Sequence, residues 1–204
     1  FEEHEIDILV GTQMVSKGLD FNDVNLVGIF DTDRMMHFPD FRASERTFQL
    51  ITQVSGRAGR RENPGRVVIQ TSDPDHVLIR RIVNHDFIGF YNREITERRL
   101  FHYPPFVRLI NLTIRHLSRE ECKRAALMLE KDLRQRLAPK MLVGPQEALI
   151  PRIRNQYHWQ LLIKMGKHKV DLARVKLIVK ESASNLLRNK SHKGTSIIFD
   201  VDPA

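Results

Sequence analysis

The chain has 204 residues, of which 41% are hydrophobic and 28% charged, and its formal net charge is +8. That length allows one domain or two small ones, each with its own core. No apolar run approaches the roughly 20 residues that cross a bilayer, and the start Phe-Glu-Glu-His-Glu is unlike a signal peptide. The composition therefore excludes an integral membrane protein and predicts a cytosolic one.

Charge is divided unevenly along the chain. Residues 1–100 contain 13 Lys and Arg against 16 Asp and Glu, a net of −3, whereas residues 101–204 contain 20 against 9, a net of +11. A cationic half favours a polyanionic partner such as nucleic acid, although binding to ribosomes or to membrane surfaces would give the same pattern. The lone cysteine, Cys122, excludes an internal disulfide and fits a small core residue. We expect no metal site.

The first 71 residues follow an α/β pattern. The apolar run Ile6 to Val10 predicts a buried strand, and Asn25 to Asp31 a second one whose acidic end sits at the carboxyl edge of a parallel sheet. Ala43 to Ala58 predicts a helix, and Arg66 to Thr71 alternates as a third strand after a Pro-Gly turn. Strand, loop, strand, helix and strand together indicate a layered α/β unit.

The loop from Gly11 to Phe21 has the composition of a phosphate-facing segment. It follows a predicted strand and carries the hydroxyls of Thr12 and Ser16 beside glycines, an arrangement that lets backbone amides meet phosphate. Asp20 does not suit a phosphate ligand. We interpret it as an acceptor for a sugar hydroxyl or as a partner for an arginine.

The stretch Gln53 to Arg60 reads Gln-Val-Ser-Gly-Arg-Ala-Gly-Arg. As a helix end it places Gln53, Arg57 and Arg60 on one stripe, while Phe48, Ile51 and Val54 form a second, apolar stripe. Arginines at the end of a rigid element suit a polyphosphate, because each guanidinium keeps its charge and offers a planar fork of donors. A surface loop made basic for solubility is the alternative.

The second half predicts its own small domain. Asp75 to Leu100 reads as helical, and Tyr103-Pro104-Pro105-Phe106 then acts as a stiff boundary. Alternation and capping predict the order βαββαβ, which is typical of a split-βαβ sheet with two helices on one face. The strands are expected at 109–115, 141–149, 159–165 and 195–201, with helices from a Ser118 cap to Pro139 and over 171–187.

A basic surface is expected on this domain. Residues 140–193 contain twelve Lys and Arg against three acids, with Tyr157 and Trp159 among them, which suits a single strand whose bases stack between cations. The alternative for Trp159 is a core position. Lys167 and Lys169 are candidates for receiving an acidic peptide tail. Asp200 and Asp202 could hold a metal but fit better as a structural pair.

Several segments resemble a known family. Residues 11–21 resemble motif V and residues 53–60 motif VI of superfamily 2 helicases, which together mark a second RecA-like lobe. The segments 40–46 (Asp-Phe-Arg-Ala-Ser-Glu-Arg), 103–106, Gly144-Pro145, 157–160 (Tyr-His-Trp-Gln) and 200–203 (Asp-Val-Asp-Pro) are similar to the C-terminal part of primosomal protein N-prime, the replication-restart helicases of bacteria.

The resemblance implies an ATP-dependent 3′-to-5′ DNA helicase that assembles the primosome at stalled forks. Arg60 would be the arginine finger, Arg57 would lie beside it, and Gln53 would approach the γ-phosphate, with Asp20 and Gly18 also binding nucleotide. The implied DNA contacts are Thr12, Arg152, Arg154, His158, Lys164, Arg188 and Lys190. The implied partners are forked and single-stranded DNA, single-strand binding protein at Lys167 and Lys169, and other primosome proteins; we expect a monomer.

The sequence also departs from this family. It contains no Gly-x-x-x-x-Gly-Lys-Ser/Thr loop and no Asp-Glu-x-His, the groups that hold ATP and magnesium, and the family's zinc ligands are absent. His158 stands where an arginine is common. The sequence thus predicts a helicase fragment, inactive by itself, comprising part of a RecA-like lobe (1–85), a helical linker (86–106) and a basic α+β domain (107–204). A stand-alone binding module is the alternative.

Overall fold

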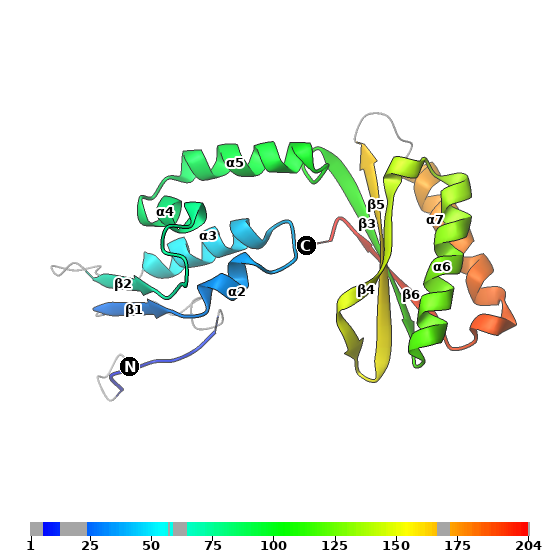
Figure 1. Ribbon diagram of the computed structural model, residues 1–204, viewed down its shortest axis with the longest axis horizontal. Helices are drawn as coiled ribbons and strands as arrows, with labels where there is room; N and C mark the ends of the chain where they lie inside the picture. Colours follow the sequence, from blue (N-terminus) through cyan, green and yellow to red (C-terminus); the bar gives the residue numbers. More distant parts are fainter. Residues whose placement is uncertain (1–5, 13–23, 57, 59–64, 167–171, 204) are drawn as a thin grey trace. The chain divides into compact units, whose positions relative to one another are not determined.

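The computed structural model describes residues 6–12, 24–56, 58, 65–166 and 172–203. The chain divides into two compact units, Phe1–Thr96 and Glu97–Ala204 (Figure 1). Both units contain helices and a sheet, so the prediction of a mixed α/β chain is confirmed. No helix in the described part of the chain is long and apolar enough to cross a membrane.

The first unit has a small parallel sheet covered on one face. Strands β1 (Leu26–Ile29) and β2 (Arg66–Ile69) pair in parallel, as expected for the second and third predicted strands. The helices are α2 (Thr32–Met36), α3 (Ala43–Ser55), α4 (Val77–Val83) and α5 (Phe87–Leu100), and the last four residues of α5 belong to the second unit. Phe48 and Ile51 of α3 are buried against Ile29 of β1, which confirms the apolar stripe of that helix.

Three sequence predictions for this unit are corrected. Ile6 to Val10 is neither a strand nor buried, since Ile8 is 77% and Val10 84% exposed. An apolar strand needs a neighbouring strand for its backbone groups, and among the described residues β1 and β2 pair only with each other. Helix α3 ends at Ser55 rather than Ala58. The helical segment from Asp75 to Leu100 is two helices, divided where His85 adopts a φ of 52°.

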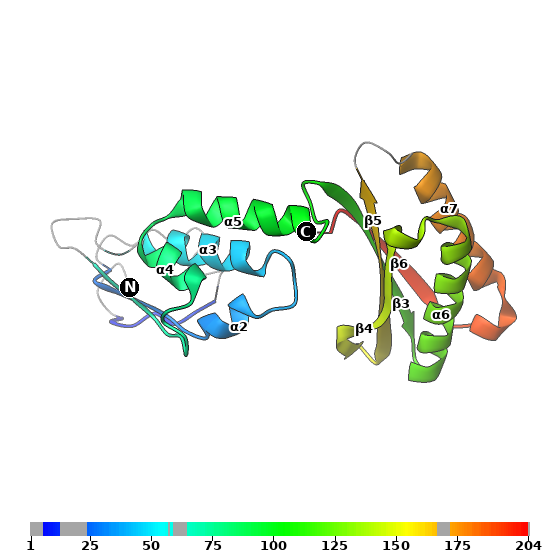
Figure 2. The same ribbon diagram turned by 45° about the horizontal axis from the view of Figure 1, so that its top comes forward.

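The second unit is a four-stranded antiparallel sheet with two helices. Its elements are β3 (Val107–His116), α6 (Arg119–Arg136), η1 (Pro139–Met141), β4 (Leu142–Ile153), β5 (Gln156–Gly166), α7 (Leu172–Arg188), η2 (Lys190–His192) and β6 (Ser196–Val201). The strands lie in the order β4-β5-β3-β6, and every neighbouring pair is antiparallel. Both helices lie on the same side of this sheet (Figures 1 and 2).

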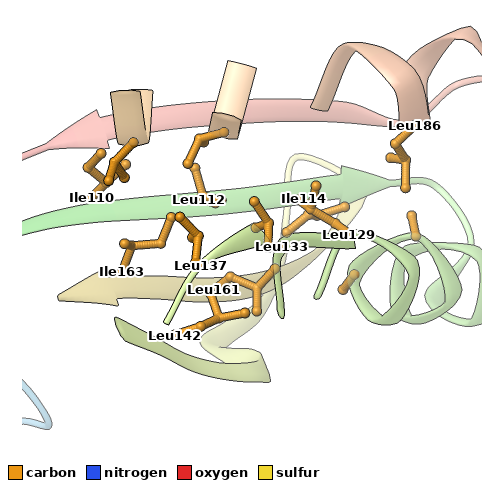
Figure 3. Packing of buried hydrophobic residues seen from close by; sticks show 14 of the residues in the cluster. Ile110, Leu112, Ile114, Leu129, Leu133, Leu137, Leu142, Leu161, Ile163 and Leu186 are labelled. Carbon is orange, nitrogen blue, oxygen red and sulfur yellow. The ribbon is translucent and has the colours of Figure 1, made fainter. Parts of the chain in front are cut away.

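The core of this unit fills the space between the sheet and the helices. Alternate residues of β3 and β5 point into it, and leucines of α6 meet them there (Figure 3). Leu112, Ile114 and Leu133 are completely buried. Cys122 is also fully buried, as predicted, and burial raises the pKa of its thiol to about 11. A thiol with that pKa stays protonated and unreactive at neutral pH.

Local signals explain the bounds of α6. The Ser118 side chain accepts a hydrogen bond from the Glu121 amide at 3.4 Å, which is one half of the predicted capping box. The Ser118 amide instead donates to the His116 ring at 2.8 Å. Glu121 therefore does not complete the box and pairs with Arg124. The helix stops before Pro139, which begins η1.

Candidate nucleic-acid interface

Several segments of the second unit come together at the C-terminal end of β3. His116, the last residue of β3, pairs with Tyr157 of β5. Its ring also lies 2.8 Å from the Ser118 amide and 3.2 Å from the Lys193 carbonyl oxygen. The start of α6, the β4–β5 turn and the segment before β6 therefore converge at one end of the sheet.

Four exposed cations lie on two of these segments or just before them, and we call this group the basic end: Arg152 just before the β4–β5 turn, Arg154 in that turn, Arg188 at the end of α7, and Lys193 before β6. The first three were predicted as DNA contacts; Lys193 was counted only in the basic stretch. The βαββαβ order by itself would have placed Lys193 here, because the segment before β6 enters the sheet at the end where β3 leaves it.

Neighbouring carboxylates are mostly neutralised. Arg119, at the start of α6, donates two hydrogen bonds to Glu147 of β4, at 2.8 and 2.7 Å. These bonds lower the pKa of Glu147 and raise that of Arg119, so the pair stays charged. Glu121 is paired with Arg124. Glu120 remains as an exposed carboxylate, and the excess charge at this end is positive.

The β4–β5 turn displays an arginine at its end. Arg154 and Asn155 both have positive φ, 48° and 65°, as the two central residues of a type I′ turn require. Asn and Gly suit these positions, whereas a long side chain there costs about 1 kcal/mol. Arg154 is exposed and forms no ion pair within the described residues. Its conformational cost is not offset by any structural contact that we observe in that part of the chain.

Arg152 is held beside the turn. Its guanidinium lies 5.3 Å from the centre of the Tyr157 ring and donates to the Asn155 side chain. These contacts fix the side chain while leaving it exposed. Trp159, two residues further along β5, is half-buried and packs against the core, which favours the core interpretation of that residue.

Lys164 lies at the opposite end of β5 from these cations. It pairs with Leu109 near the start of β3, and its ammonium donates to the Phe101 carbonyl at 3.0 Å and lies 3.8 Å from the Tyr103 ring centre. Burial lowers its pKa. Its described contacts tie the 101–103 turn to the sheet, so the structure does not bring Lys164 together with Arg152 and Arg154.

His158 is buried, with 5% of its surface exposed. Burial, and then the charge of Arg115 on the neighbouring strand, lower the pKa of its ring. The ring is therefore neutral at pH 7. Its DNA contact stays a prediction, and its burial argues against a direct one.

The predicted nucleotide residues fall largely outside the described part of the chain. The structure does not describe Arg57, Arg60, Asp20, Gly18, Lys167 or Lys169. It does not describe the side chain of Lys190 either. Gln53 lies within the described part, exposed near the end of α3, where its amide is available to a ligand. Thr12 is also exposed.

One polar cluster of the first unit was missed by the sequence analysis. Asp33, just after β1, accepts hydrogen bonds from the Thr71 hydroxyl at 2.5 Å and from the Ser72 hydroxyl and amide at 2.6 and 2.7 Å. The Ser72 and Thr71 hydroxyls are the main reason that the pKa of Asp33 falls to about 2. The sequence contained a signal for this cluster, because Asp33 follows β1 and Thr71 follows β2, and the carboxyl ends of two parallel strands meet at one edge of their sheet.

Asp202 has a structural role. Its carboxylate accepts two hydrogen bonds from Arg108, at 3.0 and 2.5 Å, and one from the Leu109 amide at 3.1 Å. The Arg108 bonds lower its pKa. In the part of the chain that the structure describes, no three His, Cys, Asp or Glu side chains gather as metal ligands would.

Comparisons with known proteins match both units. The family model described as the primosomal protein N C-terminal domain covers residues 99–204, and the helicase conserved C-terminal domain covers residues 1–62. The chain is 42% identical to the replication restart protein PriA of Bacillus subtilis (strain 168), over 100% of this chain and 25% of that protein.

Two further relatives agree. The replication restart protein PriA of Synechocystis is 43% identical over 80% of this chain and 20% of that protein. Its counterpart from Thermotoga maritima is 35% identical over 98% of this chain and 25% of that protein. The chain spans about a quarter of the length of the curated relatives that it matches.

Proposed function

The chain belongs to the family of the primosomal protein N C-terminal domain, and from this premise we propose that it serves in an ATP-dependent 3′-to-5′ DNA helicase that restarts replication at stalled forks. In this proposal residues 97–204 bind DNA through the basic end. The relatives are named replication restart proteins, and the first unit matches the helicase C-terminal domain over residues 1–62.

The observation that carries the DNA-binding proposal is the grouping of Arg152, Arg154, Arg188 and Lys193 at one end of a rigid sheet. These four residues come from three separate segments, and the described carboxylates beside them, apart from Glu120, are paired with arginines. A cluster of exposed cations on a rigid frame neutralises several phosphates at little entropic cost. A membrane surface would also attract cations, but binding there usually requires an amphipathic helix or a lipid anchor as well.

The nucleotide-binding role falls to the first unit. We propose that Arg60, Arg57 and Gln53 contact the phosphates of ATP bound with Mg²⁺, that Asp20 and Gly18 contact the nucleotide, and that Thr12 contacts the DNA backbone. Bound ATP supplies the free energy for strand movement, and these side chains stabilise charge on the transferring phosphoryl group. The domain bounds 1–85, 86–106 and 107–204, a cytoplasmic location, and recognition of an acidic tail of single-strand binding protein by Lys167 and Lys169 belong to the same proposal.

Fluorescence anisotropy of the full chain on labelled forked and single-stranded DNA tests the DNA-binding role. The variant Arg152→Ala/Arg154→Ala/Arg188→Ala should bind about tenfold or more weakly and lose about three from the slope of log affinity against log salt. Lys140→Ala is the single-charge control, because that exposed lysine lies beyond the C-terminal end of α6. Equal losses per removed charge in the two variants would show that the basic end has no special role.

ATP hydrolysis tests the enzymatic role separately. We expect the chain by itself not to hydrolyse ATP, and Arg60→Ala in the intact helicase to lower turnover by about a thousandfold or more while DNA affinity is kept. Normal turnover in that variant would refute the arginine finger. Hydrolysis by the chain alone would refute the proposal that it needs residues from elsewhere.

A further inference from the structure

The strand that leads into the β4–β5 turn is interrupted by a large bulge. Glu147 of β4 pairs with Trp159, and Arg152 pairs with Tyr157. Residues 148–151 of β4 therefore stand opposite one residue of β5, His158, and the extra residues leave the ladder. In Figure 1 the end of β4 diverges from β5 in this region. We call Leu149–Asn155 the hairpin tip.

The bulge exposes two large apolar side chains beside the basic end. Leu149 is 58% and Ile150 59% exposed, whereas Ala148 before them is buried. Arg152 and Arg154 follow within the same tip, and residues 148–170 contain no Asp or Glu. Leu149 and Ile150 are adjacent exposed aliphatic side chains, and with the nearby arginines they give the tip both an apolar and a cationic surface, a combination that suits a binding site.

The tip is held in place from two sides. The Arg119–Glu147 pair fixes β4 immediately before the bulge, at 2.7 and 2.8 Å. The contacts of Arg152 with Tyr157 and Asn155 fix the chain immediately after it. Leu149 and Ile150 are thus presented from a braced strand rather than from a free loop, and a rigid presentation is what insertion against a stacked partner requires.

The chemistry of the tip selects one kind of partner. Two arginines suit phosphates, and aliphatic side chains suit the flat apolar face of a base. In a continuous duplex the base faces are covered by their neighbours, but the last base pair before a single strand has one open face. We propose that the hairpin tip packs Leu149 and Ile150 against that terminal base pair at a duplex–single-strand junction and loosens it, while Arg152 and Arg154 hold the flanking phosphates.

This inference rests on the proposed DNA-binding function and adds to it the part of a fork that the hairpin tip contacts, the terminal base pair. The position of Arg154 supports it independently. Arg154 is an exposed residue with a long side chain at a positive-φ position of the turn that ends the hairpin, where asparagine or glycine would satisfy the turn better.

The test uses the full chain and a forked DNA that carries 2-aminopurine in the last base pair before the fork. Saturating wild-type chain should raise the fluorescence severalfold, because 2-aminopurine brightens when it is unstacked. The same base placed in the middle of the duplex arm should stay dim. Anisotropy of the same DNA reports binding in parallel.

The decisive variant is Leu149→Ser/Ile150→Ser, which keeps all charges. It should lose the fluorescence rise at saturation and weaken fork binding about fivefold, the low end for loss of a base contact. Leu177→Ser, on α7, is the control, since Leu177 is similarly exposed at 56% and lies outside the tip. It should leave both signals unchanged, and circular dichroism of both variants should match the wild type.

A photo-crosslinking residue at position 150 gives a second readout that does not depend on the serine variant. It should cross-link to nucleotides at the fork. Cross-linking to a second copy of the chain, or to the duplex interior, would overturn the proposal, as would a fluorescence rise that persists in the serine variant or is absent when the wild type is bound. Absence of any anisotropy change would instead refute the DNA-binding function itself.

Discussion

The two units of this chain bury their sheets to different extents. In the second unit, helices α6 and α7 cover one face of a four-stranded sheet, and Leu112, Ile114 and Leu161 have no exposed surface. In the first unit the described sheet has two parallel strands. Val27 and Ile29 pack inward with α3, while Leu26 and Val68 on the other face are 60% and 56% exposed.

This difference has a physical meaning. A parallel sheet is stable when both faces are covered, whereas an antiparallel sheet tolerates one solvated face. The antiparallel sheet of the second unit has polar residues such as Asn111 and Thr113 on the face away from its core, so that face can be in contact with water. The first unit leaves apolar side chains in water within the described residues. We therefore expect independent folding from the second unit only.

Separating the units should give the largest effect. Residues 97–204 should unfold in one cooperative transition, because one continuous core joins all four strands and both helices. Residues 1–96 by themselves should melt without a sharp transition and bind a hydrophobic dye. Calorimetry and near-ultraviolet circular dichroism of both pieces measure this. A sharp transition in residues 1–96, or none in residues 97–204, would contradict the expectation that only the second unit folds independently.

Two leucines, one buried in the second unit and one exposed in the first, test the same difference in burial. Leu133→Ala, in the core of the second unit, should lower the free energy of unfolding by about 2–5 kcal/mol. Leu26→Ala removes the same atoms from an exposed position in the first unit and should change it by no more than about 0.5 kcal/mol. Urea titration of the full chain gives both values. Similar losses would mean that Leu26 is covered in solution.

A smaller effect is expected at the end of β6. Asp202→Asn should lower the stability of the second unit by about 1 kcal/mol, since its bonds to Arg108 and Leu109 are partly exposed. Because the folded pKa of Asp202 is lowered, this contribution is present above about pH 4 and is lost as the pH falls. Asp200→Asn, two residues earlier in β6 and exposed, should have little effect. Equal losses at pH 7 would contradict the role of Asp202.

The smallest effect concerns a single carboxyl group of the first unit. NMR titration should give Asp33 a midpoint near pH 2, because the Ser72 and Thr71 hydroxyls donate to its charged form. Its contribution to stability is therefore present above about pH 4 and fades as the pH falls towards 2. Ser72→Ala should raise the midpoint, and Ser55→Ala, at the end of α3, should not. An ordinary midpoint in the wild type would refute the network.

The sequence predicted the second unit better than the first. Alternation in β3 and β5 and the apolar stripe of α6 are local patterns, and antiparallel neighbours convert them directly into a sheet. Ile6 to Val10 has the same apolar composition as a buried strand. Its exposure could not be read from composition, because burial depends on which other strands pair beside it.

The candidate site was predictable only in part. Runs of Arg and Lys identify a basic domain, but three-dimensional placement decides which cations act together. Arg152 and Arg154 lie at the basic end, whereas Lys164 is occupied with Phe101 and Tyr103. The bulge that exposes Leu149 and Ile150 depends on strand register, and Pro151 inside it indicates only that the ladder is interrupted or at an edge, not which side chains become exposed.

The central claim is that DNA binding resides in residues 97–204 and in their basic end. The most direct measurement compares the salt dependence of binding to forked DNA for the full chain, for residues 97–204, and for residues 97–204 carrying Arg152→Ala/Arg154→Ala. We predict equal slopes for the first two and a slope smaller by about two for the third. A slope in residues 97–204 that is much smaller than in the full chain, or one unaffected by the two substitutions, would contradict the claim.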